Sequence, residues 1–340
     1  MMKKIPFDVQ ALKDWFASTR RDLPWRKTTD PYAIWVSEIM LQQTQVAVVK
    51  EYYLRWMARF PTIAALAAAP VEEAIKMWEG LGYYSRVRNL HEAAQFLVDH
   101  YSGKMPSSKS ELAEVKGLGP YTVGAILSFA FHQRAAAVDG NTIRVLCRYY
   151  GIDGDVQKSG TQKRIWEIAE EILPEDKPWL VVEGLIELGA TVCKRDPNCM
   201  ACPLQEKCIA YQQGSQTTLP KKGKKIEITS LERQVFVIVH KEGLLAKKGE
   251  AGKVMADLYE FPYLDVTKKK DFPFSFSAVK LRNLPVVEHA FTRFRVKLFP
   301  AVWQAAEKVD VPEYEWILQH EIQRYPFSSG HRKILKLLEN

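Results

Sequence analysis

The N-terminal part of the chain has the hydrophobic pattern of a helical domain. Over residues 7–212, apolar residues recur at three- and four-residue spacing, and short breaks contain Gly, Pro or Asp. This period is typical of amphipathic helices. Asp30-Pro31 begins one such helix, expected over residues 31–45, with proline at its first position. We therefore predict a helical domain over residues 1–212.

The pattern changes after Tyr211. Residues 213–230 are polar and basic, which predicts a linker. Residues 234–240 form a β-branched and aromatic run, and a Lys-Glu-Gly turn then leads to Leu244, which predicts a β-hairpin. Further strands are expected at residues 286–287 and 295–299, and a final helix at residues 331–338. An α+β domain is therefore expected over residues 231–340.

Composition and charge narrow the class of protein. The 340 residues are 47% hydrophobic and 26% charged, which is typical of a folded chain, and the net charge of +8 favours a polyanionic partner. No apolar run approaches the roughly 18 residues that cross a bilayer. The N-terminus lacks the apolar segment of a secretory signal. We expect a cytoplasmic protein.

Four of the five cysteines lie within sixteen residues, at Cys193, Cys199, Cys202 and Cys208. A disulfide scaffold would spread its cysteines more widely, so the cluster predicts a metal site in a reducing compartment. The spacing leaves zinc and an iron–sulfur cluster both open. Cys147 stands apart in a helix and is expected to be a small buried side chain.

A Gly-rich turn between two helical stretches predicts a phosphate-binding hairpin. Lys116, Gly117 and Gly119 precede Pro120, which suits the first position of the next helix, and Ser108 with Glu111 could form a capping box for the preceding helix. The glycines allow a tight turn, and the helix N-terminus directs backbone amides at an anion. An ordinary corner between two helices is the alternative.

Two carboxyl groups have the contrasting surroundings that acid–base chemistry needs. Glu38 is flanked by apolar residues, which would raise its pKa, whereas Asp139 lies at a helix N-terminus, which favours the anion. Cleavage of an N-glycosidic bond requires one proton donor and one fixed anion. A surface Glu and a plain helix-capping Asp are the structural alternatives.

The chain resembles the MutY family of adenine DNA glycosylases, within the helix-hairpin-helix superfamily that includes endonuclease III. The matching motifs are Leu23-Pro-Trp-Arg26, Asp30-Pro-Tyr32, Ile34-Trp-Val-Ser-Glu-Ile-Met-Leu-Gln-Gln-Thr-Gln45, Gly80-Leu-Gly-Tyr-Tyr-Ser85, Lys116-Gly-Leu-Gly-Pro-Tyr-Thr-Val-Gly124 and Val138-Asp-Gly-Asn141. The resemblance implies a multidomain α plus α+β fold: a helical glycosylase core with an iron–sulfur cluster loop, followed by a MutT-like (Nudix-fold) C-terminal domain.

The resemblance also implies a reaction, which is excision of adenine mispaired with 8-oxoguanine or guanine in double-stranded DNA during base excision repair. By that similarity, Glu38 protonates adenine at N7 and Asp139 stabilises the oxocarbenium ion. Tyr121 and Asn141 would line the same site, and the cysteines would hold a 4Fe–4S cluster. A monomer suffices for this chemistry.

Further residues take DNA-contacting roles by the same similarity. Trp25 and Arg26 would line the adenine pocket, while Gln43 and Tyr83 would fill or wedge the base stack near the flipped-out nucleotide. Endonuclease III-type enzymes have a lysine at the place of Tyr121 and use it to nick the strand. A phenol cannot form that Schiff base, so a monofunctional glycosylase is expected.

The C-terminal part resembles the MutT-like domain of the family, with Asp257-Leu-Tyr-Glu-Phe-Pro262 as one matching stretch. It lacks a glutamate-rich Mg²⁺ box, which favours a recognition module over a second enzyme. Where the family has a Phe-Ser-His loop for 8-oxoguanine, this chain has Phe291, Thr292 and Arg293. The first cysteine gap is five residues, where six is usual in the family.

Three other functions remain open from the sequence. A glycosylase of the same superfamily could act on thymine opposite guanine. A non-catalytic DNA-binding homologue could keep the hairpin and the cysteines, although it would not need both Glu38 and Asp139. A zinc-binding regulator could be built on the four cysteines.

Overall fold

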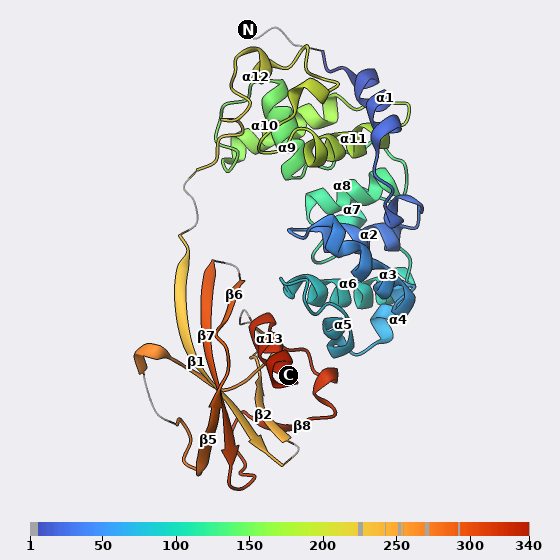
Figure 1. Ribbon diagram of the computed structural model, residues 1–340. Helices are drawn as coiled ribbons and strands as arrows, with labels where there is room; N and C mark the ends of the chain where they lie inside the picture. The colour runs from blue at the N-terminus through green and yellow to red at the C-terminus, as the bar shows by residue number, and fades with distance from the viewer. Residues whose placement is uncertain are drawn as a thin grey trace. The chain divides into compact units, whose positions relative to one another are not determined.

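The structure is a computed structural model (Figure 1), which describes residues 6–223, 227–241, 243–250, 253, 255–268, 272–291 and 293–339. The described residues divide into two compact units. The first unit takes those of residues 1–67 and 92–225, and the second takes those of residues 68–91 and 226–340. Within these ranges, no helix has both the length and the apolar character needed to cross a bilayer.

The first unit is helical, as the period of its apolar residues predicted. Its main helices are α1 (Val9–Thr19), α2 (Pro31–Leu41), α3 (Val46–Arg59), α4 (Ile63–Ala68), α7 (Lys109–Glu114), α8 (Pro120–Phe129), α9 (Gly140–Tyr149), α10 (Ser159–Glu171), α11 (Pro178–Thr191) and α12 (Ile209–Gln212), with short 3-10 turns η1 (Pro24–Arg26) and η2 (Cys199–Ala201). Helix α6 (Ser85–Tyr101) begins in the second unit's segment and continues in the first.

Short polar side chains begin several of these helices. Asp30 caps α2 by accepting from the backbone N–H of Tyr32, and proline follows it at the first helical position, as predicted. Ser108 caps α7 by accepting from the N–H of Glu111. The Glu111 carboxylate bonds the Ser108 hydroxyl, at 2.5 Å, in place of the backbone N–H that a full capping box would use.

The helix expected over residues 31–45 is shorter than predicted. It ends at Leu41, and α3 begins at Val46. Four consecutive polar residues, Gln42 to Gln45, interrupt the apolar pattern, and Gln43 takes a left-handed backbone conformation (φ 57°) that no α-helix contains. The break turns the chain beside Glu38, which lies one helical turn before the end of α2.

Close packing around α11 fixes the position of α9. Gly184 meets Leu12 of α1, where an added Cβ would lie 3.1 Å from the Leu12 side chain. Gly189 meets the start of α9, where an added Cβ would lie 2.8 Å from Cα of Asn141. Since real Cβ atoms do not approach this closely, the glycine lets α11 touch the N-terminus of α9.

The second unit contains a mixed β-sheet. Its described strands are β1 (Thr229–His240), β2 (Gly243–Lys248), β3 (Tyr259–Glu260), β4 (Tyr263–Asp265), β5 (Ala278–Asn283), β6 (Val287–Phe291), β7 (Phe294–Ala305) and β8 (Glu315–Leu318). The main order is β3-β2-β1-β7-β5, with β1 and β7 parallel; β4 pairs with β1, β6 with β7 and β8 with β2.

The central strand β1 is buried on both faces because its side chains alternate between two cores. Val235 and Val237 pack in one core, together with residues of α13 (Ser329–Leu338). Phe236 and Ile238 pack in the other, against Trp303. This apolar run was the strongest strand signal in the sequence, and the expected β1–β2 hairpin and final helix are confirmed.

The same unit includes the helical segment of residues 68–91. Helix α5 (Val71–Met77) and the first turns of α6 belong to it, with Trp78 fully buried between them. The sequence predicted these helices but gave no indication that they would pack as one unit with the sheet. The chain therefore places the Gly80–Ser85 motif in the unit that holds the C-terminal sheet.

Candidate active site

All four predicted catalytic residues line one cavity of about 640 Å³ in the first unit. Its walls come from η1 and helices α2, α8, α9 and α11. Of the predicted site residues, the cavity is lined by Trp25, Arg26, Glu38, Gln43, Tyr121, Asp139 and Asn141. The structure therefore brings together side chains that lie more than 100 residues apart in the sequence.

Glu38 is the buried carboxyl that the sequence predicted. It lies on α2 with 6% of its surface exposed, and Oε2 accepts a 2.5 Å hydrogen bond from the Tyr121 hydroxyl. Burial raises the pKa of Glu38 to about 7, against the lowering effect of the Tyr121 hydrogen bond, and the charge of Asp139 raises it further. Glu38 thus keeps a proton near neutral pH, as a general acid requires.

The Asp139 carboxyl group caps the N-terminus of α9. Oδ1 accepts from the backbone N–H groups of Asn141, at 3.0 Å, and Thr142, at 2.7 Å, while Oδ2 accepts from Asn141 Nδ2 at 2.7 Å. Two of these donors are the first free amides of a helix, which stabilise negative charge. The helix cap and the carboxyl group at the cavity wall are the same side chain.

Arg144 connects this corner to the cysteine-bearing loop. Its Nη2 donates to Asn141 Oδ1, at 2.8 Å, and to the carbonyl of Gly189, at 2.6 Å. Its Nε donates to the carbonyl of Cys193 at 2.6 Å. One guanidinium therefore orients the amide beside Asp139 and holds the first cysteine's backbone, a role that sequence motifs did not reveal.

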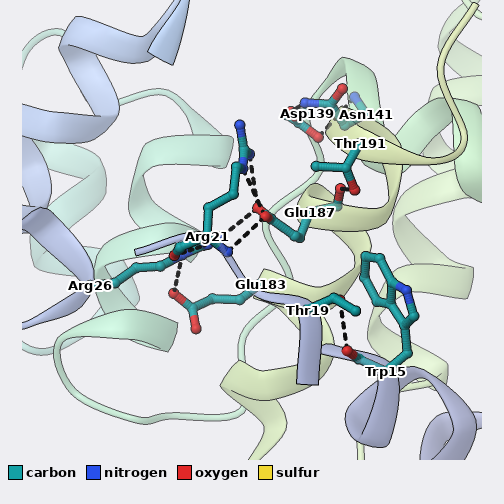
Figure 2. A network of polar contacts seen from close by, with 9 residues as sticks. All are labelled: Trp15, Thr19, Arg21, Arg26, Asp139, Asn141, Glu183, Glu187 and Thr191. Carbon is teal, nitrogen blue, oxygen red and sulfur yellow. Dashed lines mark hydrogen bonds and ion pairs between the residues drawn. The ribbon is translucent and has the colours of Figure 1, made fainter. Parts of the chain in front are cut away.

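A second polar network orients Arg26 at the cavity wall (Figure 2). Arg26 donates to Oε2 of Glu187 at 2.9 Å and lies 3.5 Å from Glu183. Glu187 also accepts two side-chain bonds from Arg21, at 2.7 and 2.8 Å. Burial would raise the pKa of Glu187, but the hydrogen bonds and charges of Arg21 and Arg26 outweigh it and lower the pKa to about 2. Glu183 is half-buried, and desolvation raises its pKa despite the nearby charge of Arg26.

The Gly-rich turn joins α7 to α8 with the geometry expected of a phosphate-binding hairpin. Gly117 takes a left-handed conformation (φ 88°), and the exposed Gly119 precedes Pro120, which begins α8. Lys116 pairs with Glu92 at 2.7 Å, with both side chains largely exposed. Such a surface pair is weak, so the lysine can exchange this carboxylate for another anion.

The two predicted wedge residues share an unusual backbone. Gln43 (φ 57°) and Tyr83 (φ 49°) are both left-handed non-glycine residues, and both side chains are exposed. Such conformations cost about 1–3 kcal/mol and concentrate at functional sites. The sequence indicated both side chains by resemblance, but it did not predict the strain.

Arg86 supports the turn that carries Tyr83. It is 8% exposed, and Nη2 donates to the carbonyls of Leu81 and Gly82 at 3.2 and 3.0 Å. Its guanidinium lies over the rings of Trp78 and Tyr83, 5.1 and 5.7 Å from their centroids. Burial lowers its pKa to about 10, so it stays charged at neutral pH. Arg86 directly follows the sequence motif Gly80–Ser85, so the motif did not include it.

Comparison with known proteins identifies the family of this chain. Residues 36–171 match the HhH-GPD superfamily of base excision DNA repair proteins, and residues 234–337 match the NUDIX domain. An adenine DNA glycosylase from Buchnera aphidicola (subsp. Schizaphis graminum) is 31% identical over 86% of both chains. The chain belongs to the adenine DNA glycosylase (MutY) family.

Relatives from mammals share more identity over a shorter stretch. The rat adenine DNA glycosylase is 44% identical over 62% of this chain but only 43% of its own length, so this chain spans less than half of that relative. Among solved structures, a thermostable thymine-DNA glycosylase is 31% identical, with a TM-score of 0.56 over 60% of this chain and 95% of that one. The two family matches and this structure confirm the predicted helical core and Nudix-like C-terminal domain.

The four clustered cysteines of this MutY-family chain line one small cavity. Cys193, Cys199, Cys202 and Cys208 are all free thiols at its wall, together with Arg148. Arg148, only 3% exposed, donates to Cys193 Sγ at 3.3 Å. Over the described ranges, no group of three or more His, Cys, Asp or Glu side chains is arranged to hold a metal ion. Cys147 is fully buried in α9, apart from this loop, as predicted.

The predicted base-recognition loop lies between β6 and β7. Phe291 is the last residue of β6, half-buried, with its ring 5.4 Å from those of His289 and Phe294. Thr292 lies outside the described residues. Phe291 therefore has both a packing role at the strand end and a partly open face beside the turn.

Other residues of the cavity were missed by sequence reasoning. His132 and Trp179 stack with centroids 4.0 Å apart at the wall, and Glu183 and Glu187 hold Arg26. Glu187 and Glu183 lie one helical turn apart on the otherwise apolar α11. Charged residues at that spacing on an apolar helix were the available signal, because buried carboxylates require partners.

Proposed function

We propose that the protein is a monofunctional DNA glycosylase that hydrolyses the N-glycosidic bond of adenine mispaired with 8-oxoguanine or guanine. The observation that carries the proposal is one cavity lined by a protonated buried carboxyl, Glu38, and a hydrogen-bonded carboxylate, Asp139. Two acid groups held in opposite charge states are what this bond cleavage needs.

Glu38 serves as the proton donor to the departing base. It transfers its proton to N7 of adenine, and the C1′–N9 bond breaks with its electron pair moving into the purine. Because Tyr121 hydrogen-bonds the same carboxyl, the conjugate base that forms is stabilised as the proton leaves. Proton transfer by a positioned carboxyl contributes about 10²–10⁴-fold in rate.

Asp139 stabilises the positive sugar that this cleavage creates. Its carboxylate either interacts with the oxocarbenium ion through charge or forms a transient bond to C1′. Water then adds to C1′ and loses a proton, which leaves an abasic site. The two amide donors and Asn141 hold the carboxylate in place, so little reorganisation is needed as charge develops.

Tyr121 supports hydrolysis without strand cleavage. A lysine at this place could attack C1′ and form a Schiff base, whereas the burial of the Tyr121 phenol and its nearness to Glu38 raise its pKa well above the ordinary value. The phenol therefore stays protonated and donates to Glu38. No covalent enzyme–DNA intermediate of the lyase type is expected.

The DNA would be held through its backbone and opened by two side chains. The free backbone N–H groups at the N-terminus of α8 and the Lys116 ammonium would bind phosphates. Gln43 and Tyr83 would enter the base stack around the extruded adenine. Trp25 and Arg26 would contact the flipped base. In the C-terminal domain, Phe291 and Thr292 would meet the oxidised guanine opposite.

We infer that the four clustered cysteines hold a 4Fe–4S cluster and not zinc. A zinc ion takes its four thiolates at about 2.3 Å around a single centre. A four-iron cluster binds each thiolate to a different iron, so its ligands lie further apart around a shared centre. Four free thiols at the wall of one cavity supply the four thiolates that either centre takes, and the resemblance to the MutY family favours the cluster. Cys193, Cys199, Cys202 and Cys208 would hold the cluster, which would order the loop as a structural centre.

One assay tests the substrate and reaction together. Base release is measured in single turnovers on duplexes with A:8-oxoguanine, A:G and T:G pairs, and alkali is added afterwards to expose abasic sites. We expect release from both adenine pairs, no strand cleavage before alkali and little borohydride-trapped adduct. Cleavage at T:G alone would replace adenine with thymine, as in the thymine-DNA glycosylase structure that this chain resembles.

A second measurement tests the cofactor. Protein purified without oxygen should be brown and absorb near 400 nm, and Cys199→Ser should weaken that absorption. The C147S variant is a matched control, since Cys147 lies outside the cysteine cavity. A colourless protein that binds zinc in stoichiometric amount would contradict the cluster.

A further inference from the structure

The second unit fixes the helical segment of residues 68–91 through a carboxylate that sits directly before the Tyr83 turn. Glu79 accepts hydrogen bonds from Arg332 Nε, at 2.5 Å, and Nη2, at 3.2 Å. It also accepts from Lys76 Nζ, at 2.5 Å, and from the backbone N–H of Phe327, at 3.2 Å. The Glu79 and Arg332 side chains are only 15% and 14% exposed. Bidentate arginine–carboxylate pairs with little solvent exposure strongly fix the relative orientation of the two side chains.

A second attachment follows the turn on its other side. Arg88, on α6, donates to the carbonyl of Ala256 at 3.0 Å and pairs with Asp257 at 3.4 Å. Asp257 and Ala256 precede β3, and Asp257 takes a left-handed conformation (φ 63°). The sheet domain therefore holds the turn by one attachment before Gly80 and one after Ser85.

The turn between these attachments is strained. Gly80 (φ 102°) and Gly82 (φ 73°) adopt positive φ without steric cost, whereas Tyr83 (φ 49°) is a left-handed non-glycine residue with 44% of its surface exposed. Strain of this kind persists only where the surroundings over-determine the conformation. The contacts of Glu79 and Arg88 with the C-terminal domain fix the backbone of the turn at its two ends. The hydrogen bonds of Arg86 fix it from within.

We propose that Glu79 and Arg88 are positioning residues through which the C-terminal domain holds Tyr83 in the conformation that enters the DNA base stack. The inference rests on the proposed glycosylase function. It gives the C-terminal domain a second role besides contact with the base opposite adenine. Loss of either attachment would let the turn move, so that part of the binding free energy would go into ordering Tyr83 when DNA binds. Base release would then slow, while proton transfer from Glu38 would be unchanged.

A double-mutant cycle in the full chain tests the proposal. Single-turnover adenine release from an A:8-oxoguanine duplex is measured for wild type, Tyr83→Ala, Arg332→Ala and the double variant. We expect each single change to slow release by about fivefold or more, and the double variant to be no slower than Tyr83→Ala alone, because both act through one side chain. Arg324→Ala is the matched control, since that arginine pairs with Glu321 at the surface with 80% of its side chain exposed.

Further measurements separate positioning from loss of folding. Thermal unfolding is followed for every variant. Arg88→Met removes the other attachment and replaces Arg332→Ala in the cycle if Arg332→Ala does not fold. In that case the rate of adenine release by the Arg88→Met/Tyr83→Ala double variant should be no lower than that of Tyr83→Ala alone. The pH profile of release should keep its wild-type midpoint in each attachment variant.

If the reductions in release rate multiply in the double variants, the proposal is overturned. Wild-type release rates in the attachment variants or in Tyr83→Ala would overturn it as well. A wild-type protein that releases no adenine would instead overturn the proposed function.

Discussion

The hydroxyl of Tyr121 donates a 2.5 Å hydrogen bond to Oε2 of Glu38, so a side chain of α8 controls the charge of a carboxyl on α2. The bond favours the ionised carboxylate, whereas burial favours the protonated acid. Burial has the larger effect and raises the pKa of Glu38 to about 7. A general acid with this pKa is both available and strong at neutral pH.

Adenine release should therefore decline as the pH rises through about 7, because Glu38 must carry a proton before cleavage and its raised pKa places the loss of that proton there. Tyr121→Phe removes a bond that stabilises the carboxylate, so the pKa of Glu38 should rise further and the decline should move to higher pH. Single-turnover rates between pH 5 and 9 measure both. An unchanged midpoint in Tyr121→Phe would show that another group limits the rate.

Asp139→Asn should abolish base release while leaving the fold and DNA binding nearly intact. Asparagine keeps one oxygen that can accept from the N–H groups of Asn141 and Thr142, so helix α9 should lose less than about 1 kcal/mol of stability. The missing negative charge removes stabilisation of the oxocarbenium ion. Single-turnover release and gel-shift binding are compared on the same mispaired duplex. Release within tenfold of wild type would contradict the proposed anionic role.

The sequence predicted the reactive side chains of this site better than the residues that orient them. Glu38 and Asp139 could be singled out because their local surroundings, an apolar helix and a helix N-terminus, can be read from neighbouring residues in the sequence. The break after Leu41 was missed because apolar residues resume at Val46 with helical spacing, and a left-handed Gln43 leaves no mark in that pattern.

The supports were missed because they depend on residues distant in the chain. Arg144 and Glu187 acquire their roles only where α9 meets α11, and Glu79 finds Arg332 more than 250 residues away. Among the strands, β5 and β8 are largely exposed or short and lack the apolar run that marked β1. Tertiary pairing, not local preference, makes them strands.

Arg144→Met should slow adenine release and loosen the cysteine loop together. Methionine keeps much of the side chain's length but loses the bonds to Asn141, Gly189 and Cys193. Misorientation of the amide beside Asp139 is expected to reduce the single-turnover rate by about tenfold or more. Arg164→Met is the control, since Arg164 pairs with Glu167 at an exposed surface. Equal rates for both variants would show that Arg144 has no part in orienting the site.

Gly189→Ala should damage activity more than its single added carbon suggests. The new Cβ would lie 2.5 and 2.8 Å from Cβ and Cα of Asn141, so α11 must move away from the start of α9. We expect a loss of stability of about 1–3 kcal/mol from overpacking, together with slower release. Gly160→Ala on α10 has no atom near its new Cβ and serves as the control. Full activity in G189A would contradict a requirement for this close contact.

Glu187→Gln should destabilise the helical unit at neutral pH and less so in acid. The carboxylate is fully buried and accepts from Arg21 and Arg26, so its removal leaves Arg21 without its anion and Arg26 with Glu183 alone, at a cost of about 3 kcal/mol. The folded-state pKa of about 2 lies below the unfolded value near 4.5. The stability from this lowered pKa is therefore present above pH 4.5 and is lost progressively as the pH falls towards 2.

Denaturant unfolding of wild type and Glu187→Gln at pH 7 and pH 3 measures this difference. The gap in unfolding free energy should narrow at the lower pH, because wild type then loses part of the same stabilisation. Glu175→Gln, whose carboxyl pairs with Arg134 while 93% exposed, should change stability little at either pH. If the difference in unfolding free energy between wild type and Glu187→Gln is the same at both pH values, the shape of Glu187 and not its charge accounts for its stabilising role.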